Sequence, residues 1–391
     1  MDEQQLEITA LEWFRVIGWE YYFGPDIAKE GSNPLRESDR DPLLIEHIRE
    51  GFERINGWIP AGQREEIFAE VLAVIRTRVP DLIENNRQFH QYLLGGIPVT
   101  LRDEAGNPRT ERVFLIDFKT PQNNRFVVAN QLSIVGSKQL RRPDIVAYIN
   151  GLPIAVIELK SPSKGNDSYA VNLEAYHQLQ TYKDELHDLF ISNGALIISD
   201  GLMARFGSLS AGMDRFMPWR VAKDEDDRPP IEWELKTLIE GLFDHHRLLD
   251  YLQNFILFKD DGRVRYKIIA GYHQFHAVQN AIKATIVASD PQGDGKIGVI
   301  WHTQGSGKSL SMCFYAGKLL KTPEMKNPTI LVVTDRNDLD DQLFATFASA
   351  ESLFSNTAPV QAASREELRQ VLSLPRYKNS PQKRWADSIK S

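Results

Sequence analysis

Three ionisable residues stand at the ends of two apolar segments that flank an Asn-Gly pair. The stretch "RRPDIVAYINGLPIAVIELKSPS" carries Asp144 where the first segment begins, and Glu158 and Lys160 where the second ends. Two carboxylates that converge at a strand end suit Mg²⁺, which prefers hard oxygen ligands and keeps several waters. This chemistry predicts phosphodiester hydrolysis, with Lys160 orienting or activating the attacking water and stabilising the phosphate. The alternative is a structural salt bridge at a sheet edge.

The hairpin must bring these three side chains to one face of a sheet. Glu158 and Lys160 are two residues apart on a strand and therefore point to the same face. A regular two-residue Asn-Gly loop would pair Asp144 with Ile157 and turn Asp144 away from Glu158. A three-residue loop, or a β-bulge elsewhere in the hairpin, restores the shared face. We therefore predict one of these two irregularities.

Two other polar pairs accompany this hairpin. Gln178 and Tyr182 are four residues apart in an expected helix over 172–190, so they share one face and are suited to reach a phosphate or the attacking water. The alternative is a polar pair on a helix surface. Arg141 and Arg142 are suited to DNA phosphates, or else form a solvated basic pair.

A second candidate site lies in "WHTQGSGKSLSM" (301–312), which resembles a phosphate-binding loop except that His302 replaces the first glycine of the template. Glycines let backbone N–H groups surround phosphates, while Lys308 is expected to reach the β- and γ-phosphates of ATP and Ser309 to bind Mg²⁺. A chance Gly/Ser turn is the alternative. The candidate nucleotide-binding residues are Gly305, Ser306, Gly307, Lys308, Ser309 and Gln274, of which Gln274 is suited to an adenine edge or is merely polar on an amphipathic helix.

The elements that must position these residues are visible as changes of hydrophobic period. Helical patterns cover 2–17, 43–56, 64–78, 172–190, 233–243 and 246–257, and strand patterns cover 111–118, 125–134, 194–199, 296–301 and 329–334. Helices and strands therefore alternate in an α/β chain. The acidic stretch "AKDEDDRPP" indicates a boundary. We expect a domain over 1–221, a linker with connecting helices over 222–258, and a phosphate-loop domain over 259–391.

Composition sets the class of protein. The 391 residues are 42% hydrophobic and 25% charged, as in a soluble globular chain. A net charge of −7 argues against binding nucleic acid through bulk charge alone, although local basic tracks remain compatible with it. Cys313 is the only cysteine, which excludes disulfides within the chain and favours a reducing compartment. With no membrane-length apolar stretch and an acidic N-terminus, we expect a cytoplasmic protein.

The order of these motifs resembles the N-terminal part of the restriction (HsdR-type) subunit of type I restriction–modification enzymes. The resemblance extends to about residue 370 and rests on "RRPDIVAYINGLPIAVIELKSP", "QLQTY", "GSLSAGMDRFMPW", "IWHTQGSGKSL" and "VVTDRNDLDDQ". It implies a PD-(D/E)xK nuclease-like domain followed by a partial RecA-like P-loop domain of a superfamily 2 helicase.

The resemblance also implies roles for residues already singled out. Asp144, Glu158 and Lys160 match the nuclease triad, Gln178 and Tyr182 match the Q-x-x-x-Y motif, and Gly305, Gly307, Lys308 and Ser309 match helicase motif I. A glutamate of the first helix often assists this nuclease fold, and Glu3 and Glu7 are both candidates.

For the function, the resemblance implies Mg²⁺-dependent endonucleolytic cleavage of double-stranded DNA, coupled in the full-length subunit to ATP-driven translocation. The implied partners are modification and specificity subunits. The motor motifs that should follow Lys308 are missing, so we expect a truncated chain with an incomplete ATPase. Two alternatives are a non-catalytic remnant that binds nucleotide or DNA, and an unrelated P-loop NTPase with structural hairpin carboxylates.

Overall fold

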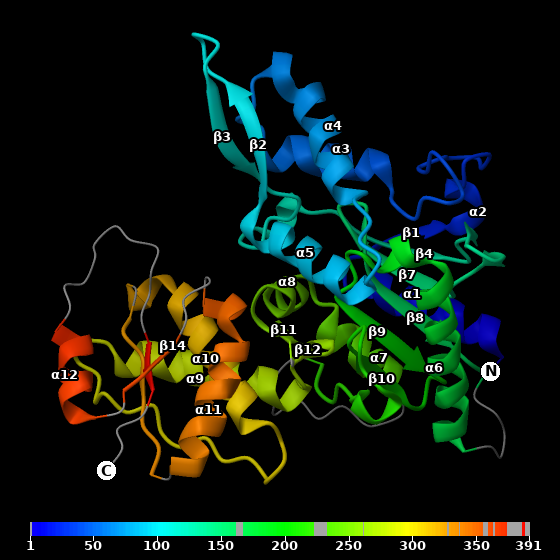
Figure 1. Ribbon diagram of the computed structural model, residues 1–391. Coiled ribbons are helices and arrows are strands. Elements are labelled where there is room, and N and C mark those ends of the chain that lie inside the picture. The colour runs from blue at the N-terminus through cyan, green and yellow to red at the C-terminus, as the bar shows by residue number, and fades with distance from the viewer. Residues whose placement is uncertain are drawn as a thin grey trace. The chain divides into compact units, whose positions relative to one another are not determined.

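The computed structural model describes residues 2–161, 167–222, 233–260, 262–326, 328–335, 337–354, 359–362, 364–373 and 385–387 (Figure 1). The chain divides into two compact units, Met1–Gln253 and Asn254–Ser391. Within the described residues, no helix combines the length and the apolar character needed to cross a membrane.

The first unit is built on a six-stranded mixed sheet with the strand order β1-β4-β7-β8-β9-β10. β1 pairs with β4 and β8 with β9 in parallel, and the other neighbours are antiparallel. These strands are β1 (Glu20–Phe23), β4 (Phe126–Asn130), β7 (Ile145–Ile149), β8 (Leu152–Leu159), β9 (Ala195–Ser199) and β10 (Ala204–Gly207). Two hairpins stand beside the sheet, β2 (Ile97–Arg102) with β3 (Pro108–Val113) and β5 (Ile134–Val135) with β6 (Leu140–Arg141).

Helices cover both faces of this sheet, which explains why β4, β7, β8 and β9 are buried along their whole length. One face packs with α6, whose Ala175, Leu179 and Tyr182 join a core cluster with Val146 and Val156. On the other side, α1 contacts β4 and β8, and α7 contacts α1 and β10 (Figure 1). The helices of this unit are α1 (Glu3–Val16), α2 (Gly24–Ile27), α3 (Ile45–Ile55), α4 (Arg64–Ile75), α5 (Leu82–Gly95), α6 (Ser168–Glu185), α7 (Glu234–Leu242) and α8 (His245–Asn254).

The β7–β8 hairpin contains the bulge that the chemistry requires. Its turn is a two-residue one, with both Asn150 (φ 47°) and Gly151 (φ 79°) in the left-handed region, so the expected three-residue loop is wrong. The register shifts between Ala147 and Tyr148, and from Ala147 outward the pairing continues to Ile145 with Ile157. Continued by one residue beyond β7, this register sets Asp144 opposite Glu158. The alternative prediction of a bulge is therefore confirmed, and both carboxylates lie on one face of the sheet.

Some expected strands of this unit are shorter than their apolar pattern. The strand expected over 111–118 ends at Val113, and the one expected over 125–134 is interrupted at Gln131, whose φ is 53°. The boundary between the units falls inside the expected linker, 222–258, because α7 and most of α8 belong to the first unit. Residues 223–232 of that linker lie outside the described residues.

The second unit holds the glycine-rich loop between helices α9 and α10. The strand expected over 296–301 is wrong, because residues 296–303 have no regular structure and Val299 and Trp301 are 93% and 82% exposed. The strand expected over 329–334 is reduced to two residues. The elements are β11 (Ile256–Asp260), β12 (Arg265–Ile269), α9 (Tyr272–Ala288), α10 (Lys308–Lys321), β13 (Leu331–Val332), α11 (Asn337–Ser349), β14 (Pro359–Gln361), α12 (Arg365–Ser373) and β15 (Trp385–Asp387).

The missing strand has a physical cause. An isolated extended segment leaves its backbone N–H and C=O groups without partners, so it forms a strand only beside another strand. Among the described residues of this unit, β13, β14 and β15 pair with one another, and β11 pairs with β12. Apolar residues alone therefore did not suffice to make 296–301 a strand.

Candidate active site

Asp144 and Glu158 form the centre of the site in the first unit, and both side chains are buried. Asp144 is 7% exposed and Glu158 fully buried. The Oδ2 atom of Asp144 accepts a hydrogen bond of 2.7 Å from the backbone N–H of Leu159. Oε2 of Glu158 is buried and has no hydrogen-bond partner among the described residues. Such an unsatisfied carboxylate oxygen is costly, and it marks a position where a cation or a proton belongs.

Lys160 neutralises one side of this pair. Its Nζ atom donates to Oε1 of Glu158 at 2.7 Å and to the carbonyl oxygen of Leu159 at 3.0 Å. Burial lowers the pKa of Lys160, but the charge of Glu158 outweighs this effect and the pKa is raised overall. Lys160 is therefore a fixed ammonium group at neutral pH, positioned to stabilise negative charge rather than to accept a proton.

The two carboxyl groups hold protons far more tightly than exposed ones. Burial raises the pKa of Asp144 to about 7, although the Leu159 N–H and Lys160 act in the opposite direction. Burial also raises the pKa of Glu158 to about 8, and the charge of Asp144 adds to the effect. A pair of this kind titrates as a unit, and near neutral pH it is poised between protonated and ionised forms.

Helix α6 places two polar groups on the face of the sheet that carries the carboxylates. Nε2 of Gln178 donates to the hydroxyl oxygen of Tyr182 at 2.5 Å, and that hydroxyl donates to the backbone carbonyl of Arg142 at 3.3 Å. Burial raises the pKa of Tyr182, and the charge of Glu158 raises it further. Gln178 and Tyr182 therefore share one face of α6, as expected, and their role at Asp144 and Glu158 stays a prediction.

Helix α1 adds two glutamates with different surroundings. Glu7 is buried, and its two carboxylate oxygens accept hydrogen bonds from the side-chain amides of Asn130 and Gln131. Glu3 is half-buried and its carboxylate has no partner among the described residues. The charge of Glu3 raises the pKa values of Asp144, Glu158 and Lys160.

Sequence reasoning overlooked Asn130 and Gln131. Gln131 has a left-handed backbone and its N–H donates to the carbonyl oxygen of Asp144 at 3.1 Å. Its side chain binds Glu7, so this residue joins α1 to the segment that carries Asp144. The available signal was an Asn-Gln pair inside the apolar segment 125–134, at the point where β4 ends.

The two arginines before Asp144 have different surroundings in the fold. Arg141 makes two hydrogen bonds of 2.8 Å to the carboxylate of Glu185 and is therefore committed within the protein. Arg142 is exposed, and its guanidinium group makes no hydrogen bond or ion pair with a described residue. Only one member of the pair is thus available to a ligand.

The residues present are compatible with a hard divalent cation. Asp144 and Glu158 supply carboxylate oxygens on one face, and the unpartnered Oε2 of Glu158 is the atom that a cation would satisfy. The described residues contain no group of three or more His, Cys, Asp or Glu side chains arranged for a metal. A cation that keeps several water ligands, as Mg²⁺ does, matches such a two-carboxylate site.

The glycine-rich loop of the second unit has part of the expected geometry. Gly305 (φ 82°) and Gly307 (φ 79°) are both left-handed, and Gly307 caps α10, of which Lys308 is the first residue. Lys308 Nζ donates to the carbonyl oxygens of His302 and Thr303, at 3.2 and 3.1 Å. A helix N-terminus with a lysine at its start is a favourable place for phosphate.

The side chain of Gln274 contacts this loop and does not project into solvent. It is buried; its Oε1 atom accepts from the N–H of Gly271 at 2.8 Å, and its Nε2 atom donates to the carbonyl oxygen of Gly307 at 3.1 Å. Ser306 brings a buried hydroxyl without a partner to the same loop, and Ser309 is half-buried at the second position of α10. Gln274 on α9 is therefore hydrogen-bonded to the loop that holds the other candidate nucleotide-binding residues, which continue into the first two residues of α10.

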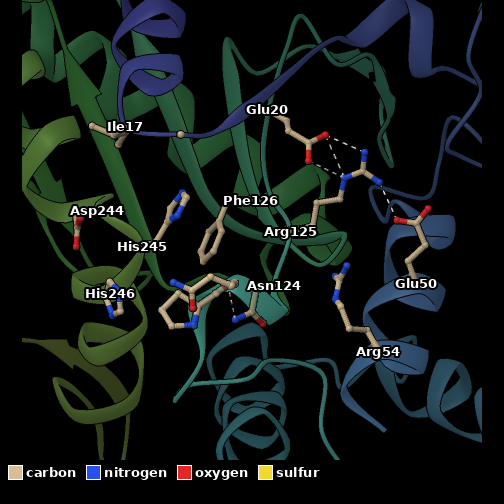
Figure 2. Close-up of a pocket in the computed structure, with 13 residues that line it drawn as sticks. Ile17, Glu20, Glu50, Arg54, Asn124, Arg125, Phe126, Asp244, His245 and His246 are labelled. Atoms are coloured by element: carbon tan, nitrogen blue, oxygen red, sulfur yellow. Dashed lines mark hydrogen bonds and ion pairs between the residues drawn. The ribbon is translucent and has the colours of Figure 1, made fainter. Parts of the chain in front are cut away.

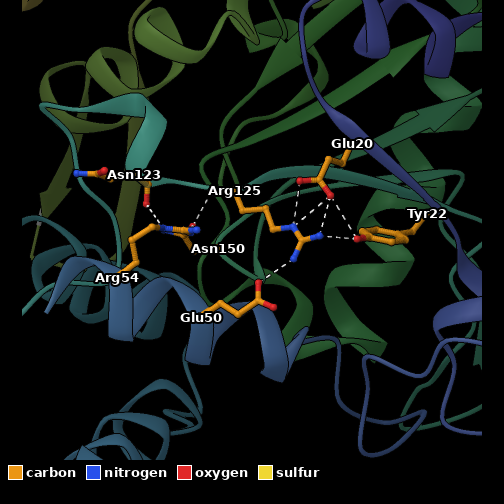
Figure 3. A network of polar contacts seen from close by, with 7 residues as sticks. All are labelled: Glu20, Tyr22, Glu50, Arg54, Asn123, Arg125 and Asn150. Carbon is orange, nitrogen blue, oxygen red and sulfur yellow. Dashed lines mark hydrogen bonds and ion pairs between the residues drawn. The ribbon is translucent and has the colours of Figure 1, made fainter. Parts of the chain in front are cut away.

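A separate polar cavity of about 520 Å³ lies at the beginning of β4, beside Phe126 (Figure 2). His245 stacks on Phe126 there with ring centroids 3.9 Å apart. Arg125 binds Glu20 at 2.8 Å and Glu50 at 2.7 Å, as Figure 3 shows. Because two carboxylates neutralise this arginine, the cavity holds a structural ion-pair network, unlike the site at Asp144, where Oε2 of Glu158 has no partner among the described residues.

Two family models match the chain, one in each unit. Residues 1–215 match the family model described as type I restriction enzyme R protein N terminus. Residues 273–380 match the model described as SWI2/SNF2 ATPase, which makes the second unit helicase-like. The first match spans more than half of the chain.

Two curated relatives are similar over most of this chain. The HindI type I restriction enzyme endonuclease subunit of Haemophilus influenzae is 43% identical over 377 residues, which cover 95% of this chain and 35% of that protein. A protein of Methanocaldococcus jannaschii, assigned as the MjaIXP type I restriction enzyme endonuclease subunit, is 32% identical over 373 residues, covering 90% and 34%. The chain thus spans about a third of the length of these relatives.

Proposed function

Because this chain belongs to the family of type I restriction enzyme R proteins, as their N-terminal portion, we propose that its first unit is a Mg²⁺-dependent DNA endonuclease domain of the PD-(D/E)xK type. The observation that carries the proposal is the bulge in the β7–β8 hairpin, which sets Asp144 and Glu158 on one face. A structural salt bridge would not need two buried carboxylates side by side, because their mutual repulsion is unfavourable without a cation.

Asp144 and Glu158 would hold the metal ion. When bound there, Mg²⁺ would lower the pKa of a water molecule and offset the negative charge that develops on the phosphate. The pair must lose its protons first, since a metal competes with protons for the same oxygens. Burial of the pair strengthens its interaction with the charge of a bound cation.

The neighbouring side chains would position the substrate. Lys160, held by Glu158, would place its positive charge beside the scissile phosphate and orient the attacking water. Gln178 and Tyr182 form one hydrogen-bonded pair next to Glu158, and they would donate to a phosphate oxygen or to that water. For the first helix, we propose that Glu3 supplements the site, because Glu7 already binds two amides.

For the second unit, we propose ATP binding at the loop between α9 and α10. The backbone N–H groups of 305–307 would surround the phosphates, Lys308 would contact the β- and γ-phosphates, and Ser309 would help to hold Mg²⁺. Gln274 would reach an adenine edge only after it releases Gly307. The domain limits proposed for these roles are 1–221 for the nuclease and 259–391 for the partial motor lobe.

For the full-length subunit, we propose endonucleolytic cleavage of double-stranded DNA coupled to ATP-driven translocation. The subunit would work in a complex with modification and specificity subunits. The relatives named as type I restriction endonuclease subunits support this proposal. In such a complex, recognition of the target sequence belongs to other chains, which agrees with the absence of a base-reading motif in this sequence.

The nuclease proposal is tested by incubating the chain with supercoiled plasmid and Mg²⁺ and following nicked and linear products. Asp144→Ala and Lys160→Ala should each lower the cleavage rate by about 100-fold or more, because each removes charge that acts on the reacting phosphate. Lys119→Ala, which alters an exposed lysine outside the site, should cleave like the wild type. Equal nicking by all four proteins would favour the second candidate, a non-catalytic remnant that binds nucleotide or DNA.

A further inference from the structure

The β5–β6 hairpin stands directly before Asp144 and is firmly attached to α6. Ile134 pairs with Arg141 and Val135 with Leu140, and the N–H of Gly136 donates to the carbonyl oxygen of Gln139 at 2.9 Å. Ser137 and Lys138 therefore form the tip of a tight turn. The chain leaves this hairpin through Arg142 and Pro143 and enters the active site at once.

Two contacts fix the hairpin to the C-terminal end of α6. The N–H of Ser137 donates to the carbonyl oxygen of Glu185 at 3.0 Å, and the guanidinium group of Arg141 makes a bidentate pair with the Glu185 carboxylate. A third contact lies closer to the site, where the hydroxyl of Tyr182 donates to the carbonyl of Arg142. A shift of the hairpin would therefore move both Tyr182 and Asp144.

The outward side of the hairpin carries two exposed cations, and the charge of one of them, Lys138, also acts on the carboxylate of Glu185 and lowers its pKa. Lys138 and Arg142 are exposed, and neither side chain makes a hydrogen bond or an ion pair with a described residue. Arg142 lies two residues before Asp144 in the chain; burial raises the pKa of Glu7 on α1, and the charge of Arg142 acts in the opposite direction. Leu140, between the two cations, is 59% exposed.

DNA binding at this site requires positive charge outside the carboxylate cluster. Asp144 and Glu158, with Glu3 nearby, repel a DNA phosphate, and the ammonium group of Lys160 is already engaged by Glu158. A duplex therefore needs cations outside the carboxylate cluster to hold the phosphates that flank the scissile one. The hairpin is the element beside Asp144 that supplies them.

We propose that the β5–β6 hairpin holds the backbone of double-stranded DNA at the cleavage site, with Arg142 and Lys138 each contacting a phosphate and Arg141 serving as the internal anchor. The proposal rests on the proposed nuclease function and deepens it, because it assigns the substrate contacts of the same site. The contacts are sequence-independent, as phosphate contacts are.

The test measures DNA binding without cleavage. The 391-residue chain is titrated into a fluorescein-labelled duplex in EDTA over a series of salt concentrations, and fluorescence anisotropy gives the affinity. Arg142→Ala and Lys138→Ala should each weaken binding by roughly three- to tenfold at low salt and reduce the slope of log K against log salt by about one. Arg142→Lys should keep most of the slope, because it keeps the charge.

Two controls match the variants in type and exposure. Arg102→Ala on β2 and Lys119→Ala remove exposed cations whose side chains make no hydrogen bond or ion pair with a described residue, and both should bind like the wild type. Thermal unfolding shows that each variant is folded. Wild-type slopes in Arg142→Ala and Lys138→Ala, slopes reduced equally in the controls, or no duplex binding by the wild type would each overturn the proposal.

Failure of the nuclease proposal gives a different result. Asp144→Ala removes a carboxylate and should bind the duplex at least as well as the wild type in EDTA. If no protein in the series cleaves plasmid in Mg²⁺ while the hairpin variants still lose affinity, the nuclease proposal fails and the hairpin contacts stand. If cleavage depends on Asp144 but the hairpin variants bind normally, only the hairpin proposal fails.

Discussion

At the scale of single residues, the proton affinity of Asp144 and Glu158 is the property from which metal binding and stability both follow. In the unfolded chain these carboxyls ionise near their ordinary pKa values of 3.8 and 4.5, whereas in the fold they hold protons to about 7 and 8. Over this interval the folded state binds more protons than the unfolded state. The free energy of unfolding of the metal-free protein therefore decreases as the pH rises from about 4 to 8.

Asp144→Asn tests this relation. At pH 8 the amide removes one buried charge beside Glu158, so we expect a gain on the order of 1 kcal/mol, or about 2–4 °C in the Tm of the metal-free protein. At pH 5 the wild-type carboxyl is already protonated, and the difference should disappear. Differential scanning calorimetry in EDTA at both pH values measures this, with the exposed Asp184→Asn as the control.

Added Mg²⁺ should make the wild type more stable than Asp144→Asn at pH 8. Ligand that binds only the folded state raises its stability in proportion to the logarithm of its concentration. The wild type should gain Tm with Mg²⁺ at pH 8, and Asp144→Asn should gain little. A stabilisation of the variant that is the same at pH 5 and pH 8 would contradict the raised pKa values.

Residue types alone led to Asp144, Glu158, Lys160, Gln178 and Tyr182, and the fold joins Lys160 to Glu158 and Gln178 to Tyr182 by hydrogen bonds. The choice between Arg141 and Arg142 was beyond the sequence, because it depends on Glu185, which reaches the pair only through the packing of α6. Asn130 and Gln131 were not predicted for the same reason, since Glu7, to which their side chains donate hydrogen bonds, is distant in the chain.

At the scale of elements, the β7–β8 hairpin shows what local sequence can and cannot predict. The Asn-Gly turn and the two apolar strands follow from residue preferences. The requirement for an irregular register follows from the chemistry. The position of the bulge follows from neither, because it depends on how β7 and β8 fit between β4, β9 and the helices. The extra residue in β8, Ile154, is buried like its neighbours and gives no signal.

Gly151→Ala tests how strongly the turn of this hairpin is held. A Cβ atom there would lie 2.3 Å from the carbonyl oxygen of Leu44 and 2.9 Å from Ile48 Cγ1, in addition to the strain of a left-handed φ. Gly106→Ala in the β2–β3 turn has a similar φ of 84° but no atom within 4 Å of the added carbon. Gly106→Ala should cost about 1–2 kcal/mol of unfolding free energy from strain alone.

The steric clash of the added Cβ atom should make Gly151→Ala lose roughly 1–3 kcal/mol more unfolding free energy than Gly106→Ala. Overpacking against backbone is not relieved by a change of rotamer. Urea unfolding followed by far-UV circular dichroism measures both variants. Equal losses would mean that α3, which begins at Ile45 beside this turn, moves away freely and does not support the hairpin.

At the scale of the whole molecule, the two units differ in how completely their sheets are formed. The first unit has a continuous sheet covered by helices on both faces. In the second unit, the apolar stretch before the phosphate loop stays exposed, with Val299 and Trp301 almost fully open to solvent. The loop and α10 were predictable from the glycines and from Lys308. The strand was not, because its formation depends on neighbouring strands that the local pattern does not contain.

This difference predicts an inactive motor in the 391-residue chain. Nζ of Lys308 binds the carbonyl oxygens of its own loop, and Gln274 binds Gly307, so both groups are occupied where a nucleotide would need them. We expect no ATP hydrolysis above background, with or without duplex DNA, in a coupled assay for released phosphate.

A longer subunit that supplies partner strands for 296–301 should gain DNA-stimulated hydrolysis, and Lys308→Ala should abolish that gain because the lysine stabilises charge on the transferred phosphate. Lys283→Ala, at an exposed position on α9, is the matched control. DNA-stimulated hydrolysis by the 391-residue chain that disappears in Lys308→Ala would contradict the prediction. It would mean that the exposed segment is compatible with a working phosphate loop.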